Sequence, residues 1–366
     1  MAAVLMPSGS HITGSLEIVR RFLVQGGRVV DPAPRSPAKV SADRKVRVLA
    51  VVHGWFPFLA AGSERMMQHL LSALPEDEFE VQVLSYGAGE PDSTMETDYE
   101  YEGTPVHRGL NPPRNYTPDL IILHHGYAAR LAPTYTEQFP HASVVVVYHN
   151  ERYDIPDLKA VGADLNVFNT KWVKDALRLP GIVVRPPLEY ERHHVDQTGD
   201  RVTLINLQEN KGVDTFYSLG QRMGEFQFLG VIGTHGDQKF PPPFRNHQIE
   251  VMGTTQDMRE VWAQTKVLLM PSEYESYGMC AAEACVSGIP VIAHPTPGLT
   301  ECLGSAGIFI DREDVDGYEK ALRLLLTDEN HYQERSALAA LRGRELVSQT
   351  QKELRKFVTA IRKLVR

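Results

Sequence analysis

Two glutamates, Glu275 and Glu283, lie eight residues apart in PSEYESYGMCAAEACVSGIPVIAH, residues 271–294. The pattern predicts a glutamate loop after a short apolar strand, then a helix of small residues carrying the second glutamate, then another strand after Gly288 and Pro290. The first turn of a helix has unpaired backbone N–H groups and a partial positive charge, so it attracts anions such as phosphate. Two acids beside one helix start therefore predict chemistry on a phosphorylated donor.

The elements that must position these acids alternate between strand-like and helix-like runs, which is typical of parallel sheets with crossover helices. The first series has strands at 46–52, 79–84, 119–123, 143–148 and 164–168, and a helix from Ser63 to Leu74 that Ser63 is expected to cap. The second has strands at 201–207, 226–231, 248–251, 266–270, 289–293 and 307–310, and helices from Gly212 and at 256–264. We therefore expect an α/β protein with two Rossmann-like, doubly wound domains that face each other across a cleft holding the site.

Breaks in this alternation predict the domain boundaries. Residues 1–45 form an N-terminal extension with a Pro-rich linker and no assigned role, residues 46–188 the first domain, and residues 189–348 the second. A hinge is expected between Arg185 and Gly199, where Pro186-Pro187 interrupts regular structure. Residues 349–366 predict a basic amphipathic helix, which can lie on an anionic membrane surface or pack its apolar face on a domain.

Length and composition narrow the class of protein. The 366 residues exceed the length over which one core usually keeps growing, and no apolar run reaches the about 20 residues needed to span a bilayer. The N-terminus lacks the pattern of an export signal, so we expect a cytoplasmic location. A formal net charge of −8 gives no basic footprint for general nucleic-acid binding. Three cysteines, none in metal-ligand spacing, predict neither disulfides nor a zinc site.

Two motifs make the chain resemble a known family, the nucleotide-sugar-dependent retaining glycosyltransferases of family 4, relatives of glycogen synthase. The run NLQENKG, residues 206–212, resembles the family's phosphate-binding loop. The stretch from Pro271 to Ala293 resembles its paired-glutamate motif, followed by Pro297-Gly298 and Glu301. The resemblance implies the GT-B fold, a UDP- or GDP-sugar donor as substrate, no required metal or other cofactor, and a last helix that crosses back onto the first domain.

The resemblance also implies roles for residues of the second domain. Lys211 would pair with the donor diphosphate and stabilise the charge that grows on the leaving group. Glu283 would accept hydrogen bonds from the ribose hydroxyls, and Glu275 would bind the transferred sugar near its reacting carbon. The backbone N–H groups of residues around the helix start would hold sugar hydroxyls and phosphates; these residues are Tyr277, Gly278, Met279 and Cys280. The competing interpretation makes Glu283 a solvated helix residue and Glu275 a helix cap.

In the first domain the resemblance points to His149 and Gly62. His149 ends the apolar strand SVVVVYH and so emerges at the carboxyl edge of the sheet, where it would donate a hydrogen bond to, or accept one from, the donor sugar. Gly62 would let a loop amide approach the diphosphate or the acceptor. His53, His124 and His125 occupy similar strand-end positions and are given no role.

The chain departs from the family pattern at two positions. Family members usually carry arginine five residues before the lysine, where this chain has Asn206. An amide donates hydrogen bonds but supplies no charge, so phosphate stabilisation would depend more on Lys211 and on helix-start amides. Ala61 replaces one of two usual glycines. The Asp-x-Asp run at Asp314 and Asp316 is interpreted as solvated helix-start acids, not as a metal motif.

The leading hypothesis is a hexosyltransferase that takes a sugar from a UDP- or GDP-sugar and keeps its anomeric configuration. The acceptor stays open among a glycan, lipid, protein, small molecule or modified DNA. Retention can proceed through a covalent intermediate between two carboxyl groups, or by a front-face route in which the donor phosphate helps deprotonate the acceptor. A nucleotide-sugar epimerase on the same architecture is a second hypothesis. A non-catalytic nucleotide-sugar or glycan-binding protein is a third.

Overall fold

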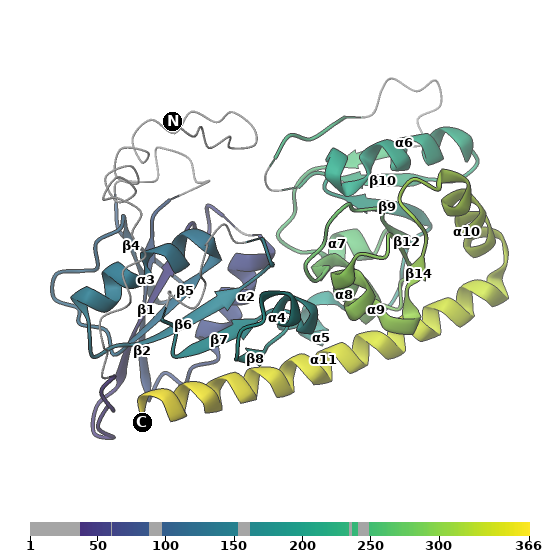
Figure 1. Cartoon of the computed structure of the whole chain (residues 1–366). Coiled ribbons are helices and arrows are strands. Elements are labelled where there is room, and N and C mark those ends of the chain that lie inside the picture. The colour runs from purple at the N-terminus through teal and green to yellow at the C-terminus, as the bar shows by residue number, and fades with distance from the viewer. Residues whose placement is uncertain (1–36, 60, 88–96, 153–161, 234–235, 241–248) are drawn as a thin grey trace.

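The computed structural model describes residues 37–59, 61–87, 97–152, 162–233, 236–240 and 249–366. Residues 1–36 of the predicted N-terminal extension lie outside the described part of the chain. The described residues form two lobes, each built on one sheet, and a single long helix runs along both of them (Figure 1).

The first lobe contains an eight-stranded sheet in the order β3-β4-β2-β1-β5-β6-β7-β8. Every neighbouring pair is parallel except β3 and β4, which form an antiparallel edge. Its strands are β1 (Val46–Val52), β2 (Phe79–Ser85), β3 (Tyr99–Tyr101), β4 (Thr104–Arg108), β5 (Leu120–His124), β6 (Ser143–Tyr148), β7 (Leu165–Phe168) and β8 (Ile182–Val183). Its helices are α2 (Gly62–Ser72), α3 (His125–Gln138) and α4 (Lys171–Leu177). The short helix α5 (Tyr190–His193) lies in the connection to the second lobe.

The second lobe contains a six-stranded, fully parallel sheet in the order β11-β10-β9-β12-β13-β14. Its strands are β9 (Arg201–Ile205), β10 (Phe228–Val231), β11 (Ile249–Met252), β12 (Thr265–Met270), β13 (Val291–Ala293) and β14 (Ile308–Phe309). Its helices are η3 (Glu209–Lys211), α6 (Val213–Arg222), α7 (Arg259–Trp262), α8 (Met279–Val286), α9 (Pro297–Leu303), η4 (Gly304–Ala306) and α10 (Val315–Thr327). The strand order reverses between β9 and β12, and in the first lobe between β1 and β5, so crevices form at the carboxyl ends of these strands.

The eleven predicted strands agree with the structure to within a few residues, and β1 and β6 occupy the predicted residues, whereas β3, β4 and β8 were not predicted. The predicted cap of the first helix is wrong. Ala61, not Ser63, is the N-cap of α2, and its N–H donates to the Glu64 carboxylate at 3.2 Å. Ser63 lies inside the first turn, where its hydroxyl donates to Glu64 at 2.9 Å. Asp314 caps α10 by accepting from the Gly317 N–H at 2.9 Å, in agreement with the interpretation of that acid as a helix-start residue.

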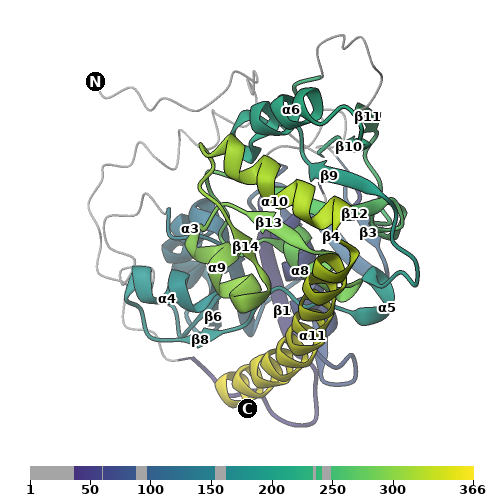
Figure 2. The ribbon, with the colours of Figure 1, turned by 90° about the vertical axis from the view of Figure 1, so that its right-hand side faces the viewer.

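The C-terminal helix α11 begins at Glu329, not near residue 349, and ends at Val365. Residues 329–348 continue it because they contain no proline and are rich in Ala, Leu, Glu and Arg. Its first half packs tightly on α8: a Cβ on Gly343 would lie 2.4 Å from the Cys285 carbonyl oxygen. Figure 2, turned by 90°, shows the helix running from the second lobe to the first.

The last turns of α11 bury an apolar stripe in the core of the first lobe. Phe357, Ile361 and Val365 are fully buried there beside residues of β1 and α2. Arg362, on the other side of the helix, forms an ion pair with Glu78. These three apolar side chains are therefore not exposed to a lipid surface. No helix among the described residues is long and apolar enough to cross a membrane.

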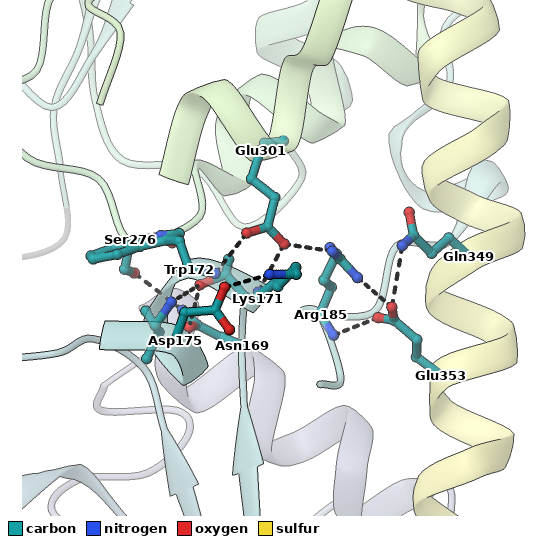
Figure 3. Close-up of polar contacts among 12 residues, drawn as sticks. Asn169, Lys171, Trp172, Asp175, Arg185, Ser276, Glu301, Gln349 and Glu353 are labelled. Atoms are coloured by element: carbon teal, nitrogen blue, oxygen red, sulfur yellow. Dashed lines mark hydrogen bonds and ion pairs between the residues drawn. The ribbon is translucent and has the colours of Figure 1, made fainter. Parts of the chain in front are cut away.

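A polar cluster joins the lobes beside the hinge (Figure 3). Arg185 lies between two carboxylates: its guanidinium donates to Glu301 of α9 at 2.5 Å and to Glu353 of α11. The Glu301 carboxylate also accepts from the backbone N–H groups of Lys171 and Trp172, each at 2.9 Å. Glu301 of the second lobe thus caps the first turn of α4 in the first lobe.

Candidate active site

A cavity of about 390 Å³ lies between the lobes, at the carboxyl ends of the strands where both sheets reverse their order. Residues of both lobes line it, and they include every site residue predicted from the sequence. From the first lobe these are Gly62 and His149, and from the second they are Asn206, Lys211, Glu275, Tyr277, Gly278, Met279, Cys280 and Glu283. The structure therefore brings together side chains that are up to 221 positions apart, from position 62 to position 283.

Lys211 and Glu275 form an ion pair at the floor of this cavity. Lys211 lies in η3, directly after β9, and its Nζ donates to Glu275 Oε1 at 2.5 Å. The Ser272 hydroxyl donates to the same carboxylate oxygen at 3.1 Å. Burial disfavours the Lys211 ammonium, but the Glu275 carboxylate favours it, and the pKa of Lys211 ends above its ordinary value. Lys211 is therefore a fixed positive charge.

The loops that carry this pair are held together by the backbone. The Glu273 N–H donates to the Asn210 carbonyl at 2.8 Å. Gly212 follows with φ +84, and a Cβ there would lie 2.3 Å from Pro271 Cγ, so only glycine lets the two loops approach this closely. Glu275 is not a helix cap, because the N-cap of α8 is Gly278.

Glu283, one turn into α8, is buried rather than solvated: its residue is 5% exposed. Its Oε2 accepts no hydrogen bond from the described residues, and the nearby His193 Nδ1 is 3.7 Å away. Burial raises the pKa of Glu283 to about 7, against a smaller lowering by the Arg65 charge. Glu283 lines the cavity, and a buried carboxylate with an oxygen that has no donor fits a ligand that brings hydroxyl donors.

The start of α8 offers backbone donors to the same cavity. Gly278 has φ +94, and a Cβ there would lie 2.6 Å from Leu299 Cδ2, so the turn into the helix needs glycine. The N–H groups of Met279 and Cys280 belong to the first turn, where no intrahelical acceptor exists. Gly62 faces them from the first lobe, since its missing Cβ would lie 3.6 Å from Met279 Cγ.

Asn206 follows β9 in a left-handed conformation with φ 71, which asparagine adopts more readily than most residues. Its side-chain oxygen accepts from Gln238 Nε2 at 2.9 Å. The amide adds no charge to the cavity, as expected from the sequence. Asn206 lines the cavity directly after β9, at the start of the predicted phosphate-binding loop.

His149 ends β6 and is the last member of a row of three histidines. His149 Nε2 lies 3.2 Å from His124 Nδ1, and His124 Nε2 lies 3.4 Å from His53 Nδ1. His53 Nε2 in turn lies 3.3 Å from the buried Glu64 carboxylate. Burial and the neighbouring His53 lower the pKa of His149 to about 3, so its ring is neutral at physiological pH.

His53 and His124, which received no role from the sequence, therefore hold His149. An ionised Glu64 only accepts hydrogen bonds, so the His53 Nε2–H group points toward it, and the contacts from His53 to His124 and from His124 to His149 fix the position of the His149 ring. His53, Glu64 and His124 also offer atoms within 4.8 Å of one another, as metal ligands would. Both ring nitrogens of the two histidines are occupied by these contacts, so a metal ion would have to displace them.

Arg65 also lines the cavity and was missed by sequence reasoning. It lies in the first turn of α2. The sequence pattern of that helix indicates only which residues face the core, and nothing local distinguishes Arg65 from a solvated arginine. Asn169 was missed as well: its Nδ2 donates to the His149 carbonyl at 2.7 Å and to the Ser276 hydroxyl at 3.2 Å, across the two lobes.

Comparison with known proteins agrees with this arrangement. Residues 202–328 match the sequence model of the family described as Glycosyl transferases group 1. A D-inositol 3-phosphate glycosyltransferase from Nocardioides is 28% identical over 149 residues, which cover 40% of this chain and 30% of that protein. O-antigen chain mannosyltransferase B from Escherichia coli is 31% identical over 75 residues, which cover 20% of each chain. The chain thus matches less than a third of the length of these curated relatives.

Solved structures match over more of the chain. The sucrose-phosphate synthase of Thermosynechococcus elongatus superposes with a TM-score of 0.69 at 17% identity, over 88% of this chain and 99% of that chain. The Anabaena protein HepE, solved with UDP and glucose, gives a TM-score of 0.65 at 14% identity, over 87% and 98%. These likenesses concern the fold, and they confirm the predicted GT-B architecture of two facing Rossmann-like lobes.

Proposed function

We propose that the chain is a member of the Glycosyl transferases group 1 family, whose sequence model its residues 202–328 match, and that it transfers a hexose from a UDP- or GDP-sugar to an acceptor hydroxyl with retention of the anomeric configuration. One observation carries the proposal: a lysine paired with Glu275, a helix start and the buried carboxylate of Glu283 line one cavity between the lobes. These are the groups that a diphosphate, a sugar and a ribose diol each require.

Each group has a task in this proposal. The donor diphosphate lies against the first turn of α8 and draws the Lys211 ammonium from its partner Glu275. The ribose hydroxyls donate to the Glu283 oxygen that has no donor of its own among the described residues. Glu275 is then released to accept hydrogen bonds from the transferred sugar. The neutral ring of His149 faces that sugar from the first lobe.

The transfer itself needs no group beyond donor and acceptor. The bond between the sugar C1 and the diphosphate oxygen breaks, and the acceptor oxygen bonds to C1 on the same face. The acceptor proton passes to the departing phosphate oxygen, so the products are a nucleoside diphosphate and a glycoside. With Lys211 drawn to the diphosphate, Glu275 Oε1 still accepts from the Ser272 hydroxyl, which favours a hydrogen-bonding role over that of a covalent nucleophile. Lys211 stabilises the charge on the leaving group.

The relatives support the donor class. HepE of Anabaena, which shares the fold, was solved both with UDP and glucose and with UDP-glucose. Curated relatives of the matched segment carry the names D-inositol 3-phosphate glycosyltransferase and O-antigen chain mannosyltransferase B. Their acceptors differ, and the residues of this chain outside 202–328 do not share the family match, so the acceptor of this protein is left unassigned.

The test measures nucleoside diphosphate release and donor consumption with UDP- and GDP-hexoses, with and without an acceptor panel and host extract. Lys211→Ala should lower turnover by about 100-fold or more, the size seen when a group that stabilises the leaving charge is removed. Glu283→Ala should weaken donor binding and so lower turnover at a fixed donor concentration, because the ribose hydroxyls lose their acceptor. Lys320→Ala, at an exposed lysine on α10, should turn over donor like the parent. The proton coupling of the product's anomeric carbon reports retention or inversion.

The outcomes separate the hypotheses. A donor that changes its sugar without any acceptor would identify an epimerase. Calorimetric binding of nucleotide without turnover across the panel would identify a binding protein. If Lys211→Ala and Glu283→Ala release nucleoside diphosphate at the parent rate, the site is wrongly assigned.

A further inference from the structure

The cavity contains less positive charge than a diphosphate requires. Among its described lining residues, the cationic or titratable bases are Arg65, His149 and Lys211. His149 is neutral at physiological pH, because burial lowers its pKa to about 3, and Lys211 is neutralised by Glu275. Asn206 adds an amide and no charge. Arg65 is therefore the one cation in the described lining whose charge is not already balanced by a neighbouring carboxylate.

Arg65 reaches the cavity from the first lobe. It lies in the first turn of α2 and is half-buried, and its guanidinium forms no hydrogen bond or ion pair with any other described residue. Its charge acts on the Cys280 thiol and on the Glu283 carboxylate of the opposite lobe. The Lys211 charge acts on the same thiol. The two cations thus approach the first turn of α8 from the two sides of the cleft.

We propose that Arg65 binds the diphosphate of the donor across the cleft and supplies the charge that Asn206 lacks. The proposal rests on the donor class proposed above and names a further residue for it. A guanidinium can hold two phosphate oxygens at once through parallel N–H donors, so one arginine suits a diphosphate clamped between two lobes. Because Arg65 lies on one lobe and Lys211 on the other, a bound diphosphate would connect them and favour the closed arrangement.

Calorimetry measures the affinity for a nucleoside diphosphate and for the matching nucleoside, and the difference between the two reports the contacts made to the phosphates. Parent, Arg65→Ala and Arg65→Lys are titrated with UDP and GDP and, in parallel, with uridine and guanosine. Arg65→Ala should weaken the binding of the nucleoside diphosphate that the parent prefers by about 10- to 100-fold, the size expected for one charge-assisted contact. Binding of the nucleoside should not change. Arg65→Lys keeps the positive charge but loses the paired N–H donors of the guanidinium. Its affinity for the nucleoside diphosphate should therefore lie between those of the parent and Arg65→Ala.

Controls distinguish this inference from the proposed function. Arg355→Ala removes an exposed arginine of α11 and should bind both ligands like the parent. Thermal unfolding of Arg65→Ala within about 1 °C of the parent would confirm that a half-buried surface change left the fold intact. A parent that binds no nucleoside diphosphate would overturn the donor class itself.

Three results would overturn the role of Arg65 alone. The first is Arg65→Ala binding nucleoside diphosphate as tightly as a parent that binds it. The second is an equal loss for nucleoside and nucleoside diphosphate, since that would place the arginine at the nucleoside. If donor affinity is unchanged and only the KM for an anionic acceptor rises, the guanidinium serves the acceptor and the proposal is wrong.

Discussion

Replacing Glu283 by glutamine tests whether the second lobe gives up stability to hold a buried carboxylate. Burial raises the pKa of Glu283 from 4.5 to about 7. The folded protein therefore binds this proton more tightly than the unfolded chain does, and the free energy of unfolding falls as pH rises from about 4.5 to about 7. Above about pH 7 the whole cost is present. It amounts to roughly 3 kcal/mol, because one pKa unit corresponds to about 1.4 kcal/mol.

Glu283→Gln keeps the size and removes the charge, so it should unfold at higher urea concentration than the parent at pH 8, by roughly 2–3 kcal/mol in free energy. At pH 5 the Glu283 carboxyl of the folded parent is largely protonated. The free energies of unfolding of the two proteins should then differ by less than about 1 kcal/mol. The same variant should lose nucleotide binding, because an amide offers one acceptor oxygen where the carboxylate offers two. Circular dichroism in urea at both pH values gives the first result, and calorimetry with UDP or GDP gives the second.

Glu273→Gln is the matched control, since Glu273 is exposed in the preceding loop and should show no pH-dependent gain. The reasoning is refuted if Glu283→Gln is no more stable than the parent at pH 8. It is equally refuted if the gain has the same size at pH 5 and pH 8, because a gain independent of pH does not come from an ionised carboxylate.

Three further changes test how the lobes hold the site. Arg185→Ala leaves the carboxylates of Glu301 and Glu353 facing each other in a partly buried place, and should destabilise the protein by about 3–5 kcal/mol in urea unfolding. Phe357→Ala removes a buried ring from the core of the first lobe and should lower the free energy of unfolding by about 3–5 kcal/mol. Amide hydrogen exchange should also become faster in the last turns of α11. Gly298→Ala places a Cβ 2.3 Å from the Glu275 carbonyl oxygen, which should strain the fold by about 1–3 kcal/mol and lower the melting temperature by a few degrees. Under the proposed function, donor turnover should also fall by about 10-fold or more.

Each change has a matched control on the same element or of the same type. Arg344→Ala and Lys356→Ala alter exposed side chains of α11 and should leave stability within about 0.5 kcal/mol of the parent. Gly253→Ala meets no atom within 4 Å and should leave turnover unchanged. Equal effects in a variant and its control would count against the specific contact.

The sequence predicted the elements whose cause is local. Strand β6 could be found because SVVVVY is mostly apolar, as a strand covered on both faces must be. The loops at Lys211 and Glu275 could be found because their motifs resemble those of a known family. Strands β3 and β4 escaped prediction, because YEY and TPVHR form a short edge hairpin without an apolar run. The start of α11 escaped because its first half is amphipathic toward α8, a partner that no local pattern reveals.

The site residues that were missed depend on contacts between distant segments. Arg65 follows Glu64 in an ordinary helix start, and its importance arises only because α2 faces α8 across the cavity. His53 and His124 looked structural, since each ends a strand, and their row with His149 requires β1, β5 and β6 to be neighbours. Adjacent parallel strands place their carboxyl ends side by side. If the sheet order had been known, the three histidines at these strand ends would have been predicted to lie in contact.

The position of Glu275 depends on the first lobe as well as the second. Trp172 Nε1, in the first lobe, donates to the carbonyl oxygen of Ser276 at 2.8 Å, and Asn169 connects the Ser276 hydroxyl to the His149 carbonyl. Figure 3 shows the contacts of Trp172 and Asn169 with Ser276 beside the Arg185 cluster. The residue next to Glu275 is thus held by the lobe that carries His149. Any separation of the lobes must release both contacts together. In the proposed function Glu275 and His149 face one sugar, and they can do so only while the lobes are closed, so the proposal makes closure a condition for the transfer rather than a consequence of it.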